Sequence, residues 1–496
     1  MTQRYTNLTE LNIRDVCKRH GSFQTFYGHG LCSLTALSRL THLQLRGWRA
    51  PKATRITYPE LPLSQQFLQG LSTLPSLVSL DLSWSNWISR PQIQLIAQLT
   101  QLTHLRLSGC NWLYDWHTDT ESIDTLSSLS SLTRLQRLNI DLEVSRDMHC
   151  NYVITDMRDL RGLSSLRCLH IGLGEPSHVV KAPVRDSLNF SFLSRLTELR
   201  ALFEYAQPEF LMAPRGLPSL TALRLLDLDW QPEGGYSDAH MAAFACMTEL
   251  TRLALCVRSD QAAYMESQVT DDGLRQLTAL QALTSLVLSG CAWVTSEGIA
   301  CLQALPQLVK LGLHLWHNTA KESRPESRRE LWAHGLPAMA AFPSLARLSL
   351  HGCGLDGSDA VHVSLLTALD HLCLSETQVA TIPDQFRTLT ALRYLDLRRV
   401  LDGALPEGLS NLLALPRLSH LDLGSEQIPL DPASIAKAAD RPSLHAVLVH
   451  MPSLRWVGMY GIPLSKGAQH GLPHITFSTE PAGGCWQPRN MESRPV

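Results

Sequence analysis

The sequence predicts an α/β solenoid, in which short parallel strands stack side by side and helical or 3₁₀ segments return along the outside. The pattern Leu-x-x-Leu-x-Leu recurs about sixteen times between Leu8 and Leu454, with a mean period of about 30 residues. Hydrophobic residues make up 44% of the 496 residues and charged residues 18%, which is typical of globular chains. One such unit is too short to bury its own apolar face, whereas stacked units share a continuous core. We therefore expect a right-handed horseshoe or arc with a concave parallel sheet over residues 1–477, followed by a Pro- and Gly-containing tail over 478–496.

The strands are predicted from the Leu-x-Leu part of the pattern. Alternation places its two leucines on one face of a strand, and the residues between them face the other way. In Leu102-Leu105-Leu107, for example, His104 and Arg106 are expected on the face opposite the core. The first leucines of the units are Leu8, Leu40, Leu77, Leu102, Leu135, Leu166, Leu199, Leu223, Leu250, Leu283, Leu308, Leu345, Leu369, Leu392, Leu418 and Leu454.

The returning segments are of several kinds. Residues 269–280 and 295–305 each contain a capping Thr at or next to the start, Thr270 and Thr295, and continue with helical periodicity, so both predict amphipathic helices. Residues 381–386 predict a short extended or 3₁₀ return. Longer insertions at 112–128, 143–159 and 317–334 are expected to project as loops, and the last of them is highly charged.

The repeats resemble those of the leucine-rich-repeat superfamily over nearly the whole chain. Segments 102–110, 283–291 and 345–353 end in Ser-Gly-Cys or His-Gly-Cys and are similar to the cysteine-containing subclass, which is frequent in F-box proteins. The resemblance implies that each Cys replaces a buried Asn that satisfies backbone groups where the chain leaves the strand. Repeats that start at Leu369, Leu392 and Leu418 look like the shorter classes. No F-box precedes the repeats, because the pattern begins by Leu8.

Composition limits the setting in which the chain acts. A formal net charge of -2 provides no global field that would attract nucleic acid or an anionic membrane. We find no signal peptide and no apolar run long enough for a membrane helix. The 12 cysteines form no Cys-x-x-Cys pair, which favours a reducing compartment. We expect a cytoplasmic protein, with a cilium or the cytoskeleton as the alternative location.

Motifs for catalysis or cofactor binding are missing from the sequence. It contains no P-loop, no Gly-x-Gly-x-x-Gly after a strand, no His-Glu-x-x-His and no Gly-x-Ser-x-Gly. His314 with His317, and His351 with His371, are close in the repeat pattern, but a metal site needs three or four converging ligands. We interpret them as exposed histidines on a binding face. The prediction is a chain that is not an enzyme and that has no cofactor and no metal.

The concave face is the predicted binding surface. Its first column of outward positions is basic at Arg252, Lys310 and Arg347 and continues to His371, while its second column is acidic at Asp227, Asp396 and Asp422. Its middle is apolar and aromatic around Ala201, Phe203, Tyr205 and Leu225. Aromatic side chains with charged flanks are typical of protein interfaces. A solvated inner face with no partner is the alternative interpretation, and the basic row lacks the interleaved aromatics of a nucleic-acid site.

Tryptophans fall at two places in the repeat. Trp87, Trp112 and Trp293 lie ten places after their first leucine, where the repeat buries an apolar side chain. Four others lie at the rim, where the chain leaves the sheet, and would either anchor a partner or pack on the neighbouring loop. These rim residues are Trp48, Trp84, Trp230 and Trp316.

The sequence therefore predicts a non-enzymatic scaffold that binds a protein partner on its concave face. A substrate-recognition adaptor of a ubiquitin ligase, a structural component of a ciliary or cytoskeletal assembly, and a ligand-sensing receptor or effector-type protein are the alternatives. No separate cap precedes Leu8, so a covering partner, a sufficiently polar start and a truncated reading frame each remain open.

Overall fold

The computed structural model divides the chain into two compact units, Met1–Pro232 (unit 1) and Glu233–Val496 (unit 2). The residues described below are 7–14, 33–47, 62–85, 88, 90–110, 125–140, 160–173, 189–204, 212, 215–231, 236–256, 268–290, 293–314, 325–379, 381–398, 408–424, 447–458 and 474–478. Each unit is a series of repeats, and each repeat adds one strand.

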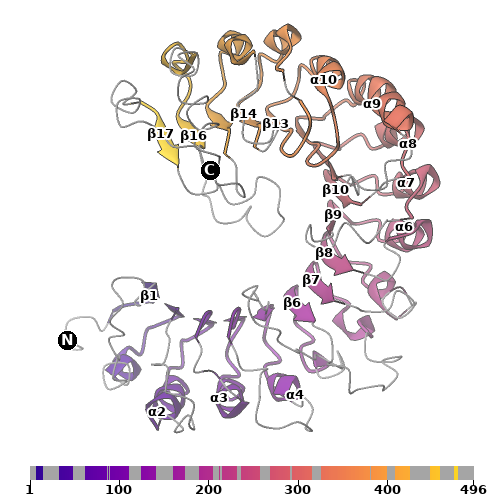
Figure 1. The fold of residues 1–496 in the computed structure, drawn as a ribbon. Helices are drawn as coiled ribbons and strands as arrows, with labels where there is room; N and C mark the ends of the chain where they lie inside the picture. The colour runs from indigo at the N-terminus through magenta and orange to yellow at the C-terminus, as the bar shows by residue number, and fades with distance from the viewer. Residues whose placement is uncertain are drawn as a thin grey trace, which may run out of the picture. The chain divides into compact units, whose positions relative to one another are not determined.

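Unit 1 contains strands that pair in chain order, every neighbour parallel to the one before (Figure 1). The strands are β1 (Glu10–Arg14), β2 (His42–Arg46), β3 (Ser79–Asp81), β4 (His104–Arg106), β5 (Arg137–Ile140), β6 (Cys168–Leu173), β7 (Glu198–Glu204) and β8 (Leu225–Gln231). Its helical segments are η2 (Ser33–Ala36), α2 (Pro62–Leu71), α3 (Arg90–Ile96), α4 (Thr125–Leu129), η5 (Ser191–Leu193) and η6 (Leu217–Ser219).

Unit 2 repeats this parallel arrangement. Its strands are β9 (Arg252–Cys256), β10 (Ser285–Ser289), β11 (Lys310–His314), β12 (Arg347–Ser349), β13 (His371–Cys373), β14 (Tyr394–Asp396), β15 (His420–Asp422), β16 (Trp456–Gly458) and β17 (Thr476–Ser478). Its helical segments are α6 (Asp238–Ala245), α7 (Asp271–Leu277), α8 (Ser296–Cys301), η8 (Leu302–Ala304), α9 (Pro325–Met339), α10 (Gly357–Val363), η10 (Asp384–Thr388) and η11 (Leu409–Ala414). The sequence pattern did not include β17, because Thr476-Phe-Ser lacks leucine.

The leucine rows form the core of each unit. Neighbouring strands pair leucine with leucine, as Leu80 does with Leu105 and Leu105 with Leu138. Leu102, Leu105 and Leu107 are all 0% exposed. Full burial of such a side chain contributes about 2 kcal/mol, and the rows repeat this contribution at every strand. In Figure 1 the helical segments of each unit lie on one side of the sheet that its strands form. This combination of parallel strands and helical returns is the predicted α/β leucine-rich-repeat solenoid.

The two capped helices are confirmed. Thr270 caps α7 and Thr295 caps α8, and each Thr hydroxyl accepts a hydrogen bond from the backbone N–H two residues later. Two of the three cysteines that end the cysteine-containing repeat segments, Cys110 and Cys353, lie within the described residues. Their thiols donate to the carbonyls of Leu82 and Leu313, at 3.1 and 2.8 Å, in the repeat before. This is the backbone-satisfying role that the resemblance implied, whereas Cys291 lies outside the described residues.

Two predictions about insertions and tryptophans are wrong. The segment 317–334 is not entirely a loop, because α9 begins at Pro325 and buries Trp332, whose Nε1 donates to the carbonyl of Cys353 at 3.3 Å. Trp293, expected in the core, is 51% exposed, because the neighbouring Val294 takes the buried position. Trp87 and Trp112 lie outside the described residues.

Candidate binding face

The open face is the name used here for the sheet side that carries the strand residues alternating with the core leucines. In unit 2 the strand register joins its first column into one continuous row, as the sequence predicts. The row consists of Arg252, Ser285, Lys310, Arg347, His371, Tyr394, His420 and Trp456. A second column, two residues further along each strand, contains Asp396 and Asp422.

Four rings at the C-terminal part of this row form a ring ladder, made of His371, Tyr394, His420 and Trp456. The His371 and Tyr394 rings stack with centroids 4.0 Å apart and an interplanar angle of 6°. Tyr394 and His420 follow at 6.0 Å and 26°, and His420 and Trp456 at 6.2 Å and 31°. All four side chains are partly exposed. The ring ladder thus presents a row of ring edges, and most ring faces are covered by the next ring.

The basic part of the row exposes less cationic surface than the sequence predicts. Arg347 is an exposed cation, with 52% of its side chain accessible, and it lies 3.7 Å from Asp370. Lys310, predicted as a contact residue, is only 7% exposed, because it lies between neighbouring strands of the packed row. Arg252 is half-buried. Of the three predicted cations, Arg347 offers the most surface.

Two histidines of this face, His371 and His314, are uncharged at neutral pH. Burial, followed by the charge of Arg347, lowers the pKa of His371 to about 3. Burial also lowers the pKa of His314 to about 3, and the charge of His351 adds to the effect. His314 is 7% exposed and lies 3.2 Å from the Ser349 hydroxyl. The interpretation of His314 as an exposed contact is therefore wrong, because its ring is a hydrogen-bonded part of the sheet.

The acidic column is structural. Asp396 and Asp422 are 0% and 2% exposed, and Arg398 lies 2.9 Å from the first carboxylate and 3.5 Å from the second. Asp227, in unit 1, is 6% exposed. These three aspartates were predicted as partner contacts, and in this structure their carboxylates are covered. A partner would reach little of them without rearranging the sheet.

Of the four predicted rim tryptophans, Trp84 is the one whose backbone and side chain are both described. Trp84 is half-buried and has a left-handed backbone (φ 66°), and its ring packs on Gly109 of the next repeat. A Cβ atom at Gly109 would lie 2.8 Å from the Trp84 ring, so the pair is a fitted contact between repeats. This favours packing on the neighbouring loop for Trp84. Trp48 and Trp316 lie outside the described residues, and only the backbone of Trp230 is described.

The aromatic middle of unit 1 was assigned in the wrong frame. The register pairs Leu169 with Leu199 and Ile171 with Ala201, so the repeat is Leu196-Leu199-Ala201 and Ala201 replaces the last leucine. Ala201 is 5% exposed and belongs to the core row, whereas only the backbone of Phe203 is described. The outward positions of β7 are instead Glu198 and Arg200. Tyr205 lies outside the described residues.

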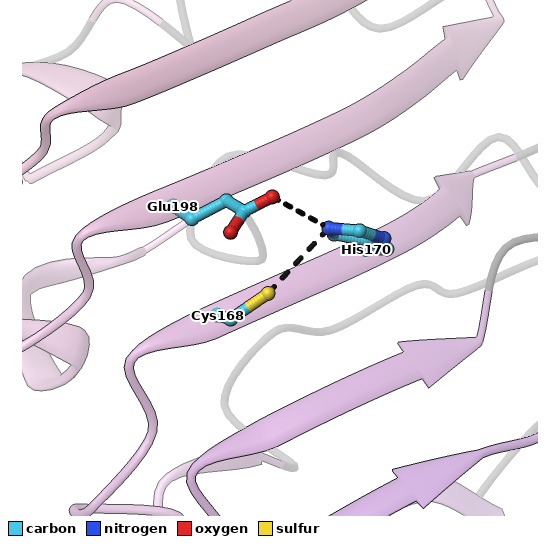
Figure 2. A group of neighbouring side chains, drawn as sticks. All are labelled: Cys168, His170 and Glu198. Carbon is cyan, nitrogen blue, oxygen red and sulfur yellow. Dashed lines mark hydrogen bonds and ion pairs between the residues drawn. The ribbon is translucent and has the colours of Figure 1, made fainter. Parts of the chain in front are cut away.

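Correcting that frame reveals a cluster of Cys168, His170 and Glu198 on the open face of unit 1 (Figure 2). The His170 Nε2 atom lies 3.0 Å from Glu198 Oε1 and 3.5 Å from Cys168 Sγ. Around this cluster, Arg200 Nε donates to Glu198 Oε1 at 3.1 Å, and the Asn139 amide lies 3.3 Å from His170 Nδ1. Sequence reasoning missed the cluster because Glu198 was placed outside the strand columns.

The two acidic groups of the cluster, the Glu198 carboxyl and the Cys168 thiol, have pKa values shifted in opposite directions. The hydrogen bond from His170 lowers the pKa of Glu198 to about 2, so the carboxylate is ionised at neutral pH. Burial, together with the charge of Glu198, raises the pKa of the Cys168 thiol to about 12. A protonated thiol is a poor nucleophile, so the cluster as it stands does not have the chemistry of a cysteine hydrolase.

Taken together, the leucine rows, the parallel register and the helical returns define a leucine-rich-repeat protein with an open sheet face. No family model matches the sequence, and no curated protein does either. Among solved structures, an internalin (InlF) from Listeria monocytogenes is similar, with 20% identity, a TM-score of 0.43, and coverage of 74% of this chain and 82% of that chain. A leucine-rich-repeat protein of Leptospira interrogans has 16% identity and a TM-score of 0.42, covering 96% of this chain and 97% of that chain.

TLR13 in complex with ssRNA13 is also similar, with 18% identity and a TM-score of 0.44. That likeness covers 86% of this chain and 56% of the TLR13 chain. Within the described part of the chain, no helix is both long and apolar enough to cross a membrane. With identities this low, the assignment of the fold rests on the strand register and leucine rows of the chain itself.

Proposed function

We propose that this chain is a non-enzymatic interaction scaffold that binds a protein partner on the open face of unit 2. The ring ladder carries the proposal, because it places four partly exposed rings in one row over β13 to β16. Aromatic side chains are over-represented among the residues that dominate protein–protein binding energy. Arg347, exposed next to the ladder on β12, adds a cation to its edge.

The ring ladder is suited to binding because its rings are already held in place. Tyr394 is packed between His371 and His420, so little side-chain freedom remains to be lost when a partner arrives. His371 is uncharged at neutral pH, so the ladder joins apolar ring edges to the exposed Arg347 guanidinium, which lies 3.7 Å from the Asp370 carboxylate. This combination fits a partner surface with an apolar ridge beside a carboxylate.

A protein partner is favoured over a single-stranded nucleic acid. Bases bind to aromatic side chains by stacking on a free ring face. In the ladder the His371 and Tyr394 planes are only 6° apart at 4.0 Å, so each covers a face of the other. The net charge of -2 also provides no general attraction for phosphates.

The proposal is tested by replacing ladder residues and following the retention of a partner. A Tyr394→Ala/Trp456→Ala variant removes the two largest rings, and Leu365→Ala/Leu413→Ala is the matched control, since those leucines are 50% and 43% exposed on the helical side. Both variants and the wild-type protein would be used for quantitative affinity capture from the native cells after chemical crosslinking. We expect the crosslinked partner to fall at least about tenfold with the ladder variant and to stay unchanged with the control. Equal retention by all three proteins would refute the ladder as the binding site.

A further inference from the structure

We propose that Cys168, His170 and Glu198 form a zinc site on the open face of unit 1, with Sγ, Nε2 and a carboxylate oxygen as ligands and a fourth position for water or a partner side chain. The three donor atoms all lie within 4.8 Å of one another. This site belongs to unit 1, whereas the proposed partner-binding ladder belongs to unit 2, so each proposal stands or fails alone.

The backbone already brings the three residues together. Cys168 and His170 alternate along β6, which directs both to the same side of the sheet. Glu198 is the register partner of Cys168 on β7. Because β6 and β7 are hydrogen-bonded along six residue pairs, the separation of the ligands is determined by the sheet rather than by a loop. Figure 2 shows the three side chains converging from these two neighbouring strands.

Two of the distances between donor atoms match those expected between neighbouring ligands of a tetrahedral zinc ion. With Zn–S near 2.3 Å and Zn–N and Zn–O near 2.0 Å, tetrahedral neighbours lie about 3.5 Å apart for S and N, and about 3.3 Å apart for N and O. The observed separations are 3.5 Å from Cys168 Sγ to His170 Nε2 and 3.0 Å from that nitrogen to Glu198 Oε1. These two separations lie within a few tenths of an ångström of the tetrahedral values, and the third, from Sγ to the carboxylate, is within 4.8 Å.

The ligand types select the ion. A thiolate and an imidazole suit Zn²⁺, whereas Ca²⁺ and Mg²⁺ prefer oxygen ligands alone. Three protein ligands with one open position are the arrangement found in zinc sites that bind a further molecule. Binding would replace the hydrogen bond from His170 Nε2 to Glu198 by two bonds to the metal. The Nε2 proton of the neutral imidazole would be given up as Nδ1 takes a proton, and the thiol proton of Cys168 would pass to solvent.

An outer layer of side chains holds the ligands in position. The Asn139 amide lies 3.3 Å from His170 Nδ1, and the Ser108 hydroxyl donates to Asn139 Oδ1 at 2.5 Å. A metal-bound histidine needs a hydrogen-bond partner at its other ring nitrogen, and the Asn139 amide can supply its oxygen after a flip. On the other side, Arg200 Nε donates to Glu198 Oε1 at 3.1 Å and orients the carboxylate.

The competing description is a cluster held by hydrogen bonds and ion pairs only. His170, Glu198 and Arg200 already satisfy one another in the absence of metal, with 13%, 20% and 14% of their side chains exposed. The cysteine separates the two descriptions. In a hydrogen-bonded cluster the Cys168 thiol keeps its proton and donates weakly to Glu198, whereas in a zinc site the sulfur is a thiolate ligand.

The first experiment is the titration of metal-free full-length protein with Co²⁺ and then Zn²⁺. Thiolate coordination gives an intense sulfur-to-cobalt charge-transfer band, and a four-coordinate ion gives strong visible ligand-field bands. We expect both, saturating at one equivalent and disappearing when Zn²⁺ is added. Absence of the charge-transfer band in the wild-type protein overturns the proposal, whatever the variants do.

The second experiment assigns the ligands. Cys168→Ser should abolish the charge-transfer band, and His170→Gln and Glu198→Gln should each weaken Zn²⁺ binding at least about tenfold in competition with a chelating dye. Asn139→Ala, in the outer layer, should weaken Zn²⁺ binding by about 10- to 100-fold while retaining the band. The controls are Cys246→Ser, an exposed thiol on the helical side, and His104→Gln on β4. Circular dichroism identifies any variant that fails to fold, and an unchanged band in folded Cys168→Ser refutes the site.

Discussion

Aspartates at the ends of strands have a role that their charge does not reveal. Asp81, Asp396 and Asp422 each accept, through Oδ1, a hydrogen bond from the backbone N–H two residues later, at 3.0, 2.9 and 3.2 Å. The carboxylate thereby satisfies a backbone donor where the chain turns out of the sheet. Three repeats use the same device, which explains why these carboxylates are buried.

Removal of the Asp396 carboxylate should destabilise the sheet locally. Asp396→Ala leaves the Arg398 guanidinium and a backbone N–H without this acceptor, and breaking a buried ion pair costs about 3 kcal/mol. Hydrogen exchange of the β14 and β15 amides measures the loss. Asp384→Ala is the control, because its carboxylate is 76% exposed beside Arg387 and should contribute less than about 0.5 kcal/mol. Equal losses in the two variants would contradict the structural role.

The lowered pKa of His314 makes stability depend on pH. Its pKa is about 3 in the folded chain and 6.5 in the unfolded chain, so between these values the unfolded state binds the extra proton. Stability is therefore complete above pH 6.5 and falls as the pH drops towards 3. From pH 7 to pH 5.5 this one group should remove roughly 1 kcal/mol. His314→Gln should flatten the dependence of unfolding midpoint on pH by that amount, and an unchanged slope would show that His314 is not responsible.

At the scale of elements, neighbouring helices are joined by a repeated contact. The Asp271 carboxylate of α7 accepts both the N–H of Thr295, at 2.8 Å, and its hydroxyl, at 2.5 Å. Asp238 of α6 accepts the same two groups of Thr270, at 2.8 and 2.7 Å. Each N-capping Thr is therefore tied to the helix before it, so one residue type both starts a helix and connects it to its neighbour.

Gly298 permits the close approach that this contact needs. A Cβ atom there would lie 2.1 Å from Asp271 Oδ1, so Gly298→Ala should separate α7 from α8 and cost about 2 kcal/mol. Gly357, at the start of α10, has no heavy atom within 4 Å of the same added Cβ. Gly357→Ala should be neutral or stabilising by up to about 1 kcal/mol. Chemical unfolding of the two variants side by side checks the pair, and destabilisation by both to the same extent would refute the steric argument.

At the scale of the whole molecule, the repeats make stability a local property. In a solenoid each repeat contacts mainly its neighbours, so the free energy of unfolding is approximately a sum over adjacent interfaces. The described strand pairings connect only strands that follow one another in the chain, within each unit. A defect in one unit should therefore leave the other largely intact.

Leu105→Ala tests this expectation. Leu105 is 0% exposed on β4, and the cavity should cost about 3 kcal/mol. Hydrogen exchange should show that loss at the amides of β3, β4 and β5, with little change at β13, β14 and β15. A uniform loss over both units would instead show that the two unfold as one cooperative body.

The sequence by itself determined the repeat, the strands and the caps. The Leu-x-x-Leu-x-Leu spacing located β1 to β16, with only the frame of β7 misassigned, and Thr270 and Thr295 marked the starts of two helices. The row from Arg252 to Trp456 was also predictable, because alternation along a strand depends only on local geometry. These are properties of segments shorter than one repeat.

The tertiary structure decided which of those side chains a partner could reach and which meet one another. Ala201 stands where the repeat usually has leucine, so the sequence pattern placed the β7 repeat in the wrong frame. Glu198 was therefore not predicted beside Cys168 and His170, whereas the strand register pairs it with Cys168. The burial of Lys310 and Asp396 likewise depends on side chains from neighbouring repeats. Contacts across the sheet join residues roughly 25 to 35 positions apart, and such contacts depend on the register of whole repeats rather than on local periodicity.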